Sequence, residues 1–211
     1  MSLRLTLVLL TVTTIESISA DSSRPLTAAT VTPSPVAQEF EWEVENPERP
    51  WEFVVIHHSA TGQGSVESIH RDHQRRRDRN GKPWLGIGYH FVVGNGNGMR
   101  DGKISPTFRW KQQLHGAHCG SLRHNSLGIG ICLIGDFHQT EPTGAQRKSV
   151  ISLIRMLTDR YAIPSKRILG HRQIRATMCP GRFFPFKDVV KESMQNNVTF
   201  NSFTSIPVSV R

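Results

Sequence analysis

Two continuous apolar runs constrain the fold of this chain more than any other feature. Residues 53–56 and 127–134 carry apolar or small side chains at every position rather than at alternate positions. This pattern is typical of strands that are buried on both faces, as in the interior of a parallel sheet. Helices must then cover both faces of that sheet, so the runs predict a layered α/β domain.

Amphipathic segments supply the covering helices. The strongest spans residues 143–161, where Thr143 is the expected N-cap and Pro164 stops any continuation. Weaker patterns predict helices at 65–78 and 186–194 and strands at 88–93 and 167–169. The apolar face of the predicted helix at 65–78 carries Val66, Ile69 and His73. That of the predicted helix at 143–161 carries Val150, Ile151, Ile154, Leu157 and Tyr161. The expected fold class is α/β, a single domain in which helices flank a central mixed β-sheet.

The N-terminus has the features of an export signal. A basic head at residues 1–4 precedes an apolar run at 5–12 that is too short to span a bilayer. Small side chains at Ser17 and Ser19 favour cleavage after Ser19, with cleavage after Ala20 as the alternative. We therefore expect a signal peptide over 1–19 and a secreted or periplasmic protein with no stable membrane span after cleavage. An uncleaved membrane tether is the competing interpretation.

Composition divides the rest of the chain. Residues 20–45 are rich in Ser, Thr, Pro and Ala, which predicts a flexible linker. Residues 46–194 form the domain, and 195–211 form a polar tail. The net charge of +9 favours polyanionic partners such as nucleic acid, anionic lipid or an acidic wall polymer. No helix-turn-helix or RNP-type motif occurs, so nucleic acid is not the expected partner.

Histidine and cysteine gather at the ends of predicted strands. His57 and His58 end the first strand, His171 follows a short strand, and Cys179 comes eight positions later. Two imidazoles and one thiolate suit Zn²⁺, and three protein ligands leave a fourth position open, as in catalytic zinc sites. The plainer alternative is a set of structural histidines and a core cysteine.

The cysteine count agrees with a metal ligand. The chain has three cysteines, Cys119, Cys132 and Cys179, so at least one thiol stays outside any disulfide. A Cys119–Cys132 disulfide is permitted in an exported protein. We expect both to be free, because Cys132 falls in a buried strand where a small apolar side chain packs well.

Four motifs occur in a fixed order along the domain. They are VIHHSAT at 55–61, GYHF at 88–91, HNSLGIG at 124–130, and GHR at 170–172 followed by CPG at 179–181. Over residues 50–190 the chain resembles the type 2 N-acetylmuramoyl-L-alanine amidases, a family that includes phage endolysins and peptidoglycan recognition proteins. The resemblance implies a zinc hydrolase that cuts the amide between N-acetylmuramic acid and L-alanine.

The resemblance also assigns residues. It implies zinc ligands at His57, His171 and Cys179, with His58 facing the other side of the strand end. Tyr89 matches the catalytic tyrosine, and Thr177 matches a position that donates a hydrogen bond to the developing oxyanion. Some relatives place a glutamate as general base on the strand that carries Cys132 here. This strand has no carboxylate, so the sequence does not name the proton acceptor.

Two further residues are candidates for substrate binding. His118 matches a position that lines the substrate groove, although a structural histidine is the competing interpretation. Trp84 is a candidate groove wall, with burial as the default for a tryptophan. The expected partner is peptidoglycan or soluble muropeptides, and the sequence does not decide between them.

Two alternatives to the enzyme are open. One is a non-catalytic peptidoglycan-binding module of the same fold; members of the family that only bind have typically lost a zinc ligand, whereas this chain retains all three candidates. The other is an unrelated basic secreted protein whose histidines are structural.

Overall fold

The computed structural model describes residues 42–78 and 80–195. The predicted signal peptide, most of the predicted linker and the tail after residue 195 lie outside this part of the chain. Within it, no helix is long and apolar enough to cross a membrane.

A five-stranded mixed sheet organises the domain, in the order β3-β2-β4-β1-β5. The central strand β1 (Phe53–His58) pairs in parallel with β4 (Gly128–Leu133) on one side and with β5 (Ile168–Gly170) on the other. Strand β2 (Phe91–Val93) runs parallel to β4 and antiparallel to the edge strand β3 (Ile104–Pro106). The α/β class and the mixed sheet predicted from the apolar runs are confirmed.

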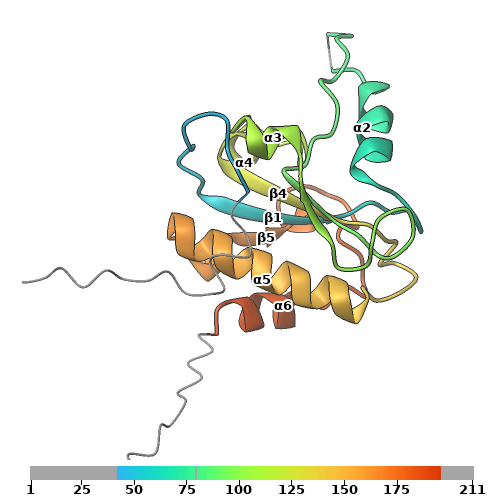
Figure 1. Cartoon of the computed structure of the whole chain (residues 1–211), viewed down its shortest axis with the longest axis vertical. Helices are drawn as coiled ribbons and strands as arrows, with labels where there is room; N and C mark the ends of the chain where they lie inside the picture. Colours follow the sequence, from blue (N-terminus) through green and yellow to red (C-terminus); the bar gives the residue numbers. More distant parts are fainter. Residues whose placement is uncertain (1–41, 79, 196–211) are drawn as a thin grey trace, which may run out of the picture. The chain divides into compact units, whose positions relative to one another are not determined.

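One face of the sheet packs against the two C-terminal helices, α5 (Gly144–Tyr161) and α6 (Phe186–Ser193) (Figure 1). Val54 and Ile56 of β1 point to this side and are fully buried. The buried side chains that α5 and α6 contribute to this core are Val150, Leu153, Ile154, Leu157 and Val189.

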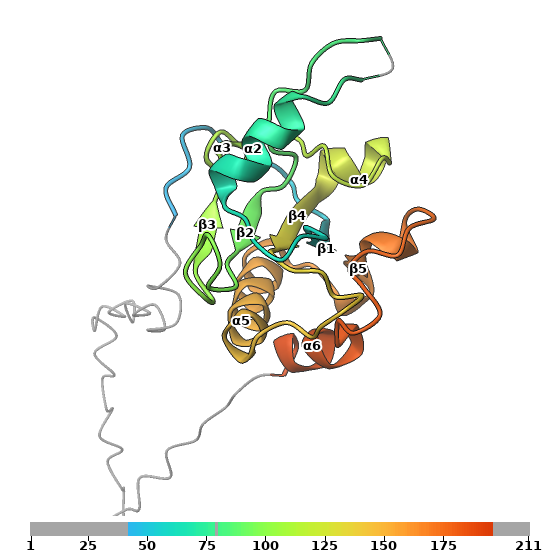
Figure 2. The same cartoon turned by 90° about the vertical axis from the view of Figure 1, so that its right-hand side faces the viewer.

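The other face meets α2 (Val66–Gln74) and α4 (Leu122–Leu127), which Figure 2 shows on the side of the sheet away from α5. Ile69 of α2 packs with Val92 and Cys132. Because side chains alternate along a strand, Phe53, Val55 and His57 of β1 all point towards this second face. The candidate metal ligand His57 is therefore on the opposite side of the sheet from α5.

The predicted N-cap Thr143 is confirmed, and Ser65 caps α2 in the same way. The Ser65 hydroxyl accepts from the backbone N–H of Ser68, and the Thr143 hydroxyl accepts from that of Gln146. In each case the third residue's side chain reaches back to the cap, which completes a capping box. Helix α2 ends at Gln74, earlier than the predicted 78. Arg75 follows in a turn, and Arg77 forms an antiparallel bridge with Pro83.

Several short elements were not predicted. They are β3, α3 (Phe108–Lys111), α4 and the 3₁₀ turns η1 (Ser165–Arg167) and η2 (His171–Gln173). The end of the predicted linker also belongs to the packed structure, because Trp42 and Val44 contact the core and the Trp42 ring lies 4.9 Å from that of Phe91. The packing of the Trp42 and Val44 side chains against the core accounts for the position of this segment.

Candidate metal centre and groove

The sheet register brings two of the three predicted zinc ligands together. Ile56 of β1 pairs with Gly170 of β5, and the next residues along each parallel strand are His57 and His171. The two imidazole centroids are consequently 4.7 Å apart. Cys179 reaches the same point from the loop after η2, where its sulfur accepts a hydrogen bond from the backbone N–H of His58 at 3.4 Å.

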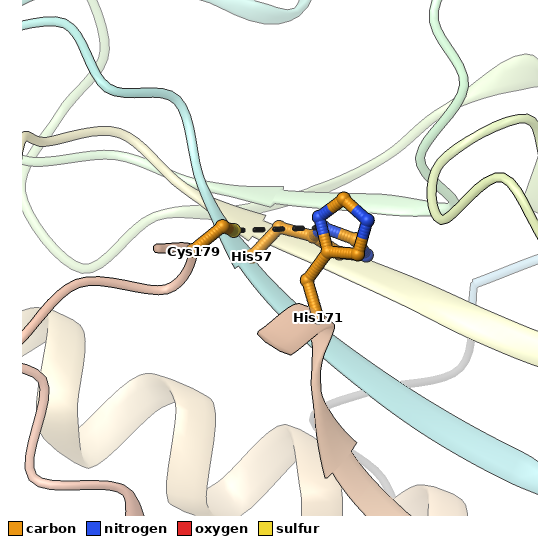
Figure 3. A group of neighbouring side chains, drawn as sticks. All are labelled: His57, His171 and Cys179. Atoms are coloured by element: carbon orange, nitrogen blue, oxygen red, sulfur yellow. Dashed lines mark hydrogen bonds between the residues drawn. The ribbon is translucent and has the colours of Figure 1, made fainter. Parts of the chain in front are cut away.

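The three side chains converge as a possible donor set (Figure 3). One ligand atom from each of His57, His171 and Cys179 lies within 4.8 Å of the others. His57 Nδ1 is 3.7 Å from Cys179 Sγ, close to the roughly 3.6 Å that separates a nitrogen and a sulfur on one tetrahedral zinc ion. His171 Nε2 is buried without a hydrogen-bond partner, so it is an orphaned donor atom that a cation would satisfy. The residues present therefore fit zinc.

Burial sets the protonation of these ligands. It lowers the pKa of His57 well below its usual value, and it also lowers the pKa of His171. Both rings are therefore neutral at pH 7 and each has a lone pair to give. Burial raises the pKa of the Cys179 thiol to about 11, so a cation must displace a proton to bind this sulfur.

Tyr89 lies beside the donor set. Its ring centroid is 5.1 Å from that of His57, and its side chain also lines an open groove. Burial raises its pKa well above 10, with the neighbouring Cys132 and Cys179 as smaller causes. At neutral pH the hydroxyl is thus a hydrogen-bond donor and not a base.

Thr177 is held next to Cys179. Its hydroxyl oxygen accepts from the backbone N–H of Cys179 at 3.3 Å, and the residue is only half-buried. Because this bond uses the oxygen as an acceptor, the hydroxyl hydrogen stays free to donate to a bound molecule.

The groove runs from Tyr89 along α2 and encloses about 790 Å³. Its walls combine hydroxyl and amide groups with one acidic and one basic side chain. The residues that line it are Ser59, Thr61, Gly62, Gln63, Gly64, Ser65, Ser68, Ile69, Asp72, His73, Arg76, Tyr89, Asn97 and Gly98. A volume of this size admits an extended peptide or sugar fragment.

The two predicted substrate-binding residues are placed differently. Trp84 is half-buried and stands edge-on to the His73 ring at 5.5 Å, with the guanidinium of Arg76 5.5 Å from its own ring. His118 is buried, with Nδ1 3.0 Å from Nε2 of His57 and Nε2 3.3 Å from the carbonyl oxygen of Gly128. Among the described residues, neither one lines the groove itself.

The chain matches a known family. A family model described as N-acetylmuramoyl-L-alanine amidase matches residues 47–182. The chain belongs to this family.

Individual relatives carry two kinds of name. Over 142 residues the chain is 32% identical to a peptidoglycan-recognition protein of Drosophila simulans, a stretch that covers 63% of this chain and 70% of that protein. Over 147 residues it is 30% identical to human N-acetylmuramoyl-L-alanine amidase, where the match covers 63% of this chain but 23% of the human protein.

Solved structures of the family agree with the fold. The amidase LysC of Clostridium intestinale superposes with a TM-score of 0.57 at 27% identity, covering 72% of this chain and 92% of that one. A Drosophila PGRP-LB mutant in complex with tracheal cytotoxin superposes with a TM-score of 0.50 at 29% identity, covering 70% and 84% of the two chains.

Two buried polar residues of this amidase-family domain, His73 and Arg109, were not predicted from the sequence to lie in or near the site. His73 was expected only on the apolar face of its helix; it also lines the groove, and its Nδ1 accepts from the backbone N–H of Gly88 at 3.0 Å. Arg109 is 2% exposed, and it donates to the carbonyl oxygens of Ile87 and His115 at 2.5 Å each. These bonds anchor the segments that lead to Tyr89 and His118, and no local sequence signal marks an arginine as buried.

The remaining site predictions concern His58 and the cysteines. His58 lies on the opposite side of the strand end from His57, as expected, and its Nδ1 accepts from the backbone N–H of Phe137 at 3.2 Å. Cys119, Cys132 and Cys179 are all free thiols in the structure. Cys132 pairs in register with His57, so no carboxylate occupies this position beside the candidate ligands.

Proposed function

We propose that the protein is a zinc-dependent N-acetylmuramoyl-L-alanine amidase that hydrolyses the amide between N-acetylmuramic acid and L-alanine in peptidoglycan. The observation that carries the proposal is that ligand atoms of His57, His171 and Cys179 lie close together, next to Tyr89. Nε2 of His171 is buried without a hydrogen-bond partner, and the Tyr89 side chain also lines the groove. Membership of the amidase family and relatives named for peptidoglycan recognition support the same substrate.

In this proposal His57, His171 and Cys179 hold the metal. Zinc, when bound, supplies a Lewis acid that polarises the amide carbonyl and lowers the pKa of water. The neutral state of His57 and His171 keeps their lone pairs available, and the Cys179 thiol gives up its proton on binding. The backbone N–H of His58 partly compensates the negative charge that then develops on the sulfur.

Tyr89 and Thr177 act on the substrate as neutral donors. The Tyr89 hydroxyl, with its raised pKa, donates a hydrogen bond that orients the scissile amide. The Thr177 hydroxyl donates to the carbonyl oxygen as negative charge develops on it. A neutral threonine stabilises this charge less than a lysine would.

The groove along α2 holds the part of the substrate that does not react. Its hydroxyl and amide groups can pair with the peptide bonds of a stem peptide or with sugar hydroxyls. Because peptidoglycan lies outside the cytoplasm, we place the working protein there, in agreement with the predicted signal peptide over 1–19 and with a secreted or periplasmic location.

The test is the chemistry of the released products. Zinc-loaded protein is incubated with purified sacculi, and the soluble fraction is assayed for stem peptides that carry a new free amino group on L-alanine. We expect release by the wild type and none after zinc is removed with a chelator. Binding to sacculi without release would assign the chain to the non-catalytic peptidoglycan-binding modules instead.

A further inference from the structure

Both ring nitrogens of His118 are engaged inside the domain. Nε2 lies 3.3 Å from the carbonyl oxygen of Gly128, and since a carbonyl only accepts, Nε2 must carry the ring proton. His118 is buried, and the ring partners that the structure gives it are an imidazole and a carbonyl, so no carboxylate compensates a second proton and the ring is neutral. Nδ1 of His118 is therefore a lone-pair acceptor, directed at Nε2 of His57 at 3.0 Å.

The acceptor role of His118 Nδ1 determines which nitrogen of His57 carries the proton. The nitrogen that faces an acceptor must donate, so Nε2 of His57 carries the single proton of that neutral imidazole. Nδ1 of His57 is then left with its lone pair, and it lies 3.7 Å from Sγ of Cys179. The hydrogen-bond chain from Gly128 through His118 to His57 thus presents a lone pair to the donor set.

The His118 ring is held in a narrow slot. A Cβ atom at Gly130 would lie 2.7 Å from Cδ2 of His118, and one at Gly116 would lie 2.3 Å from the same atom. The side-chain oxygen of Asn125 accepts from the backbone N–H of His118 at 3.0 Å. Residues of two separate segments, 116–118 and the motif at 124–130, therefore fix the position of this one ring.

We propose that His118 is a positioning residue for the metal centre, which holds His57 in the orientation and tautomer that present Nδ1 to the metal. It acts through His57 and does not contact the substrate. The inference rests on the proposed zinc site but does not depend on which reaction that site performs. Groups that orient the second nitrogen of a ligand histidine typically change metal affinity by about 10- to 100-fold.

A pair of variants separates this role from simple packing. His118→Asn keeps an oxygen acceptor close to the position of Nδ1, whereas His118→Leu fills a similar volume with no acceptor. His90→Leu is the matched control: His90 is also fully buried and its ring lies 5.9 Å from that of His118, but it bonds Gly130 and Leu114 and no candidate ligand.

Two readouts are needed, and neither uses peptidoglycan. Long-range ¹H–¹⁵N spectra of the zinc-free protein report which nitrogen of His57 is protonated, and competition with a chelator gives the zinc Kd. We expect Nε2–H on His57 in the wild type and in His118→Asn. We expect mixed tautomers and about 10- to 100-fold weaker zinc binding in His118→Leu, with His90→Leu unchanged in both readouts.

Two results would overturn the proposal. One is a proton on Nδ1 of His57 in the wild type, a measurement that holds even where a variant fails to fold. The other is zinc binding by His118→Leu within twofold of the wild type. A protein that passes both tests and releases no stem peptide from sacculi would reject the amidase and leave the positioning role intact.

Discussion

The backbone N–H of His58 donates to the sulfur of Cys179 across 3.4 Å, although 121 residues separate them in the sequence. The bond links the end of the central strand β1 to the loop after η2. It places the thiol next to His57 without any disulfide or ion pair. Because the sulfur itself accepts this bond, a variant without the sulfur loses the link to β1 as well as the candidate ligand.

The first prediction concerns metal content. Cys179→Ala should lose stoichiometric zinc, because two imidazoles alone hold the ion far more weakly than two imidazoles and a thiolate. The measurement is metal analysis of purified protein after dialysis against a weak chelator. Cys119→Ala is the control, since Cys119 is also a buried free thiol but lies outside the donor set. Equal zinc in wild type and Cys179→Ala would remove Cys179 from the site.

The second prediction concerns Tyr89. Tyr89→Phe should keep zinc and fold, because the ring stays in place, but lose on the order of 10²–10³ in turnover with the hydroxyl donor. The assay is release of L-alanine-terminated peptide from a muramoyl-peptide, alongside zinc content. Turnover close to that of the wild type at full zinc occupancy would exclude a catalytic part for this hydroxyl.

The third prediction concerns pH. Burial lowers the pKa of His73 to about 4 in the folded state, from 6.5 without that burial. Between these two values the unfolded chain binds a proton that the folded chain does not. The free energy of unfolding should therefore fall as the pH drops from 6.5 towards 4. The expected loss is up to about 1.4 kcal/mol per pH unit for each such group.

Urea unfolding of zinc-free protein at pH 7, 6 and 5 measures this effect. His73→Gln retains an acceptor for the backbone N–H of Gly88 and should show a flatter pH dependence than the wild type. His115→Gln, at an exposed histidine, should follow the wild type. Parallel curves for wild type and His73→Gln would mean that His73 is not kept neutral by the fold.

The fourth prediction concerns Arg109. Arg109→Met leaves the carbonyl oxygens of Ile87 and His115 without their buried donors. Each such group costs about 1–3 kcal/mol, so the free energy of unfolding should fall by roughly 2–6 kcal/mol. Arg71→Met, at an exposed position, should change it by less than about 0.5 kcal/mol. A loss of that small size for Arg109→Met would show that water replaces the guanidinium without cost.

The elements that could be predicted from the sequence are those whose pattern lies within the element itself. Strands β1 and β4 were predicted because their apolar runs are continuous, and α5 because its cap and stripe lie within the helix itself. Strand β3 was missed because Ile104-Ser105-Pro106 has no alternating pattern and becomes a strand only through its pairing with β2. The positions at strand ends indicated His57, His58, His171 and Cys179, and the family resemblance selected His57 over His58. The structure brings His57, His171 and Cys179 together.

Interactions between distant segments could not be predicted in this way. Nothing near His118 in the sequence indicates a hydrogen bond to His57, because that bond depends on how residues 116–118 lie beside β1 and β4. The same is true of Arg109, whose two acceptors belong to other loops. An arginine or histidine has the same sequence signature on the surface as in the core, so its burial is a tertiary property.

The edge position of β5 has a consequence for the kinetics of metal exchange. This strand has three residues, it is bonded on one side only, and His171 follows it directly. Short edge segments open far more often than a whole domain unfolds. A zinc ion held here would therefore exchange with a chelator by local fraying of β5, at a rate well above that of global unfolding, while β1 and β4 stay paired and keep His57 in place for rebinding.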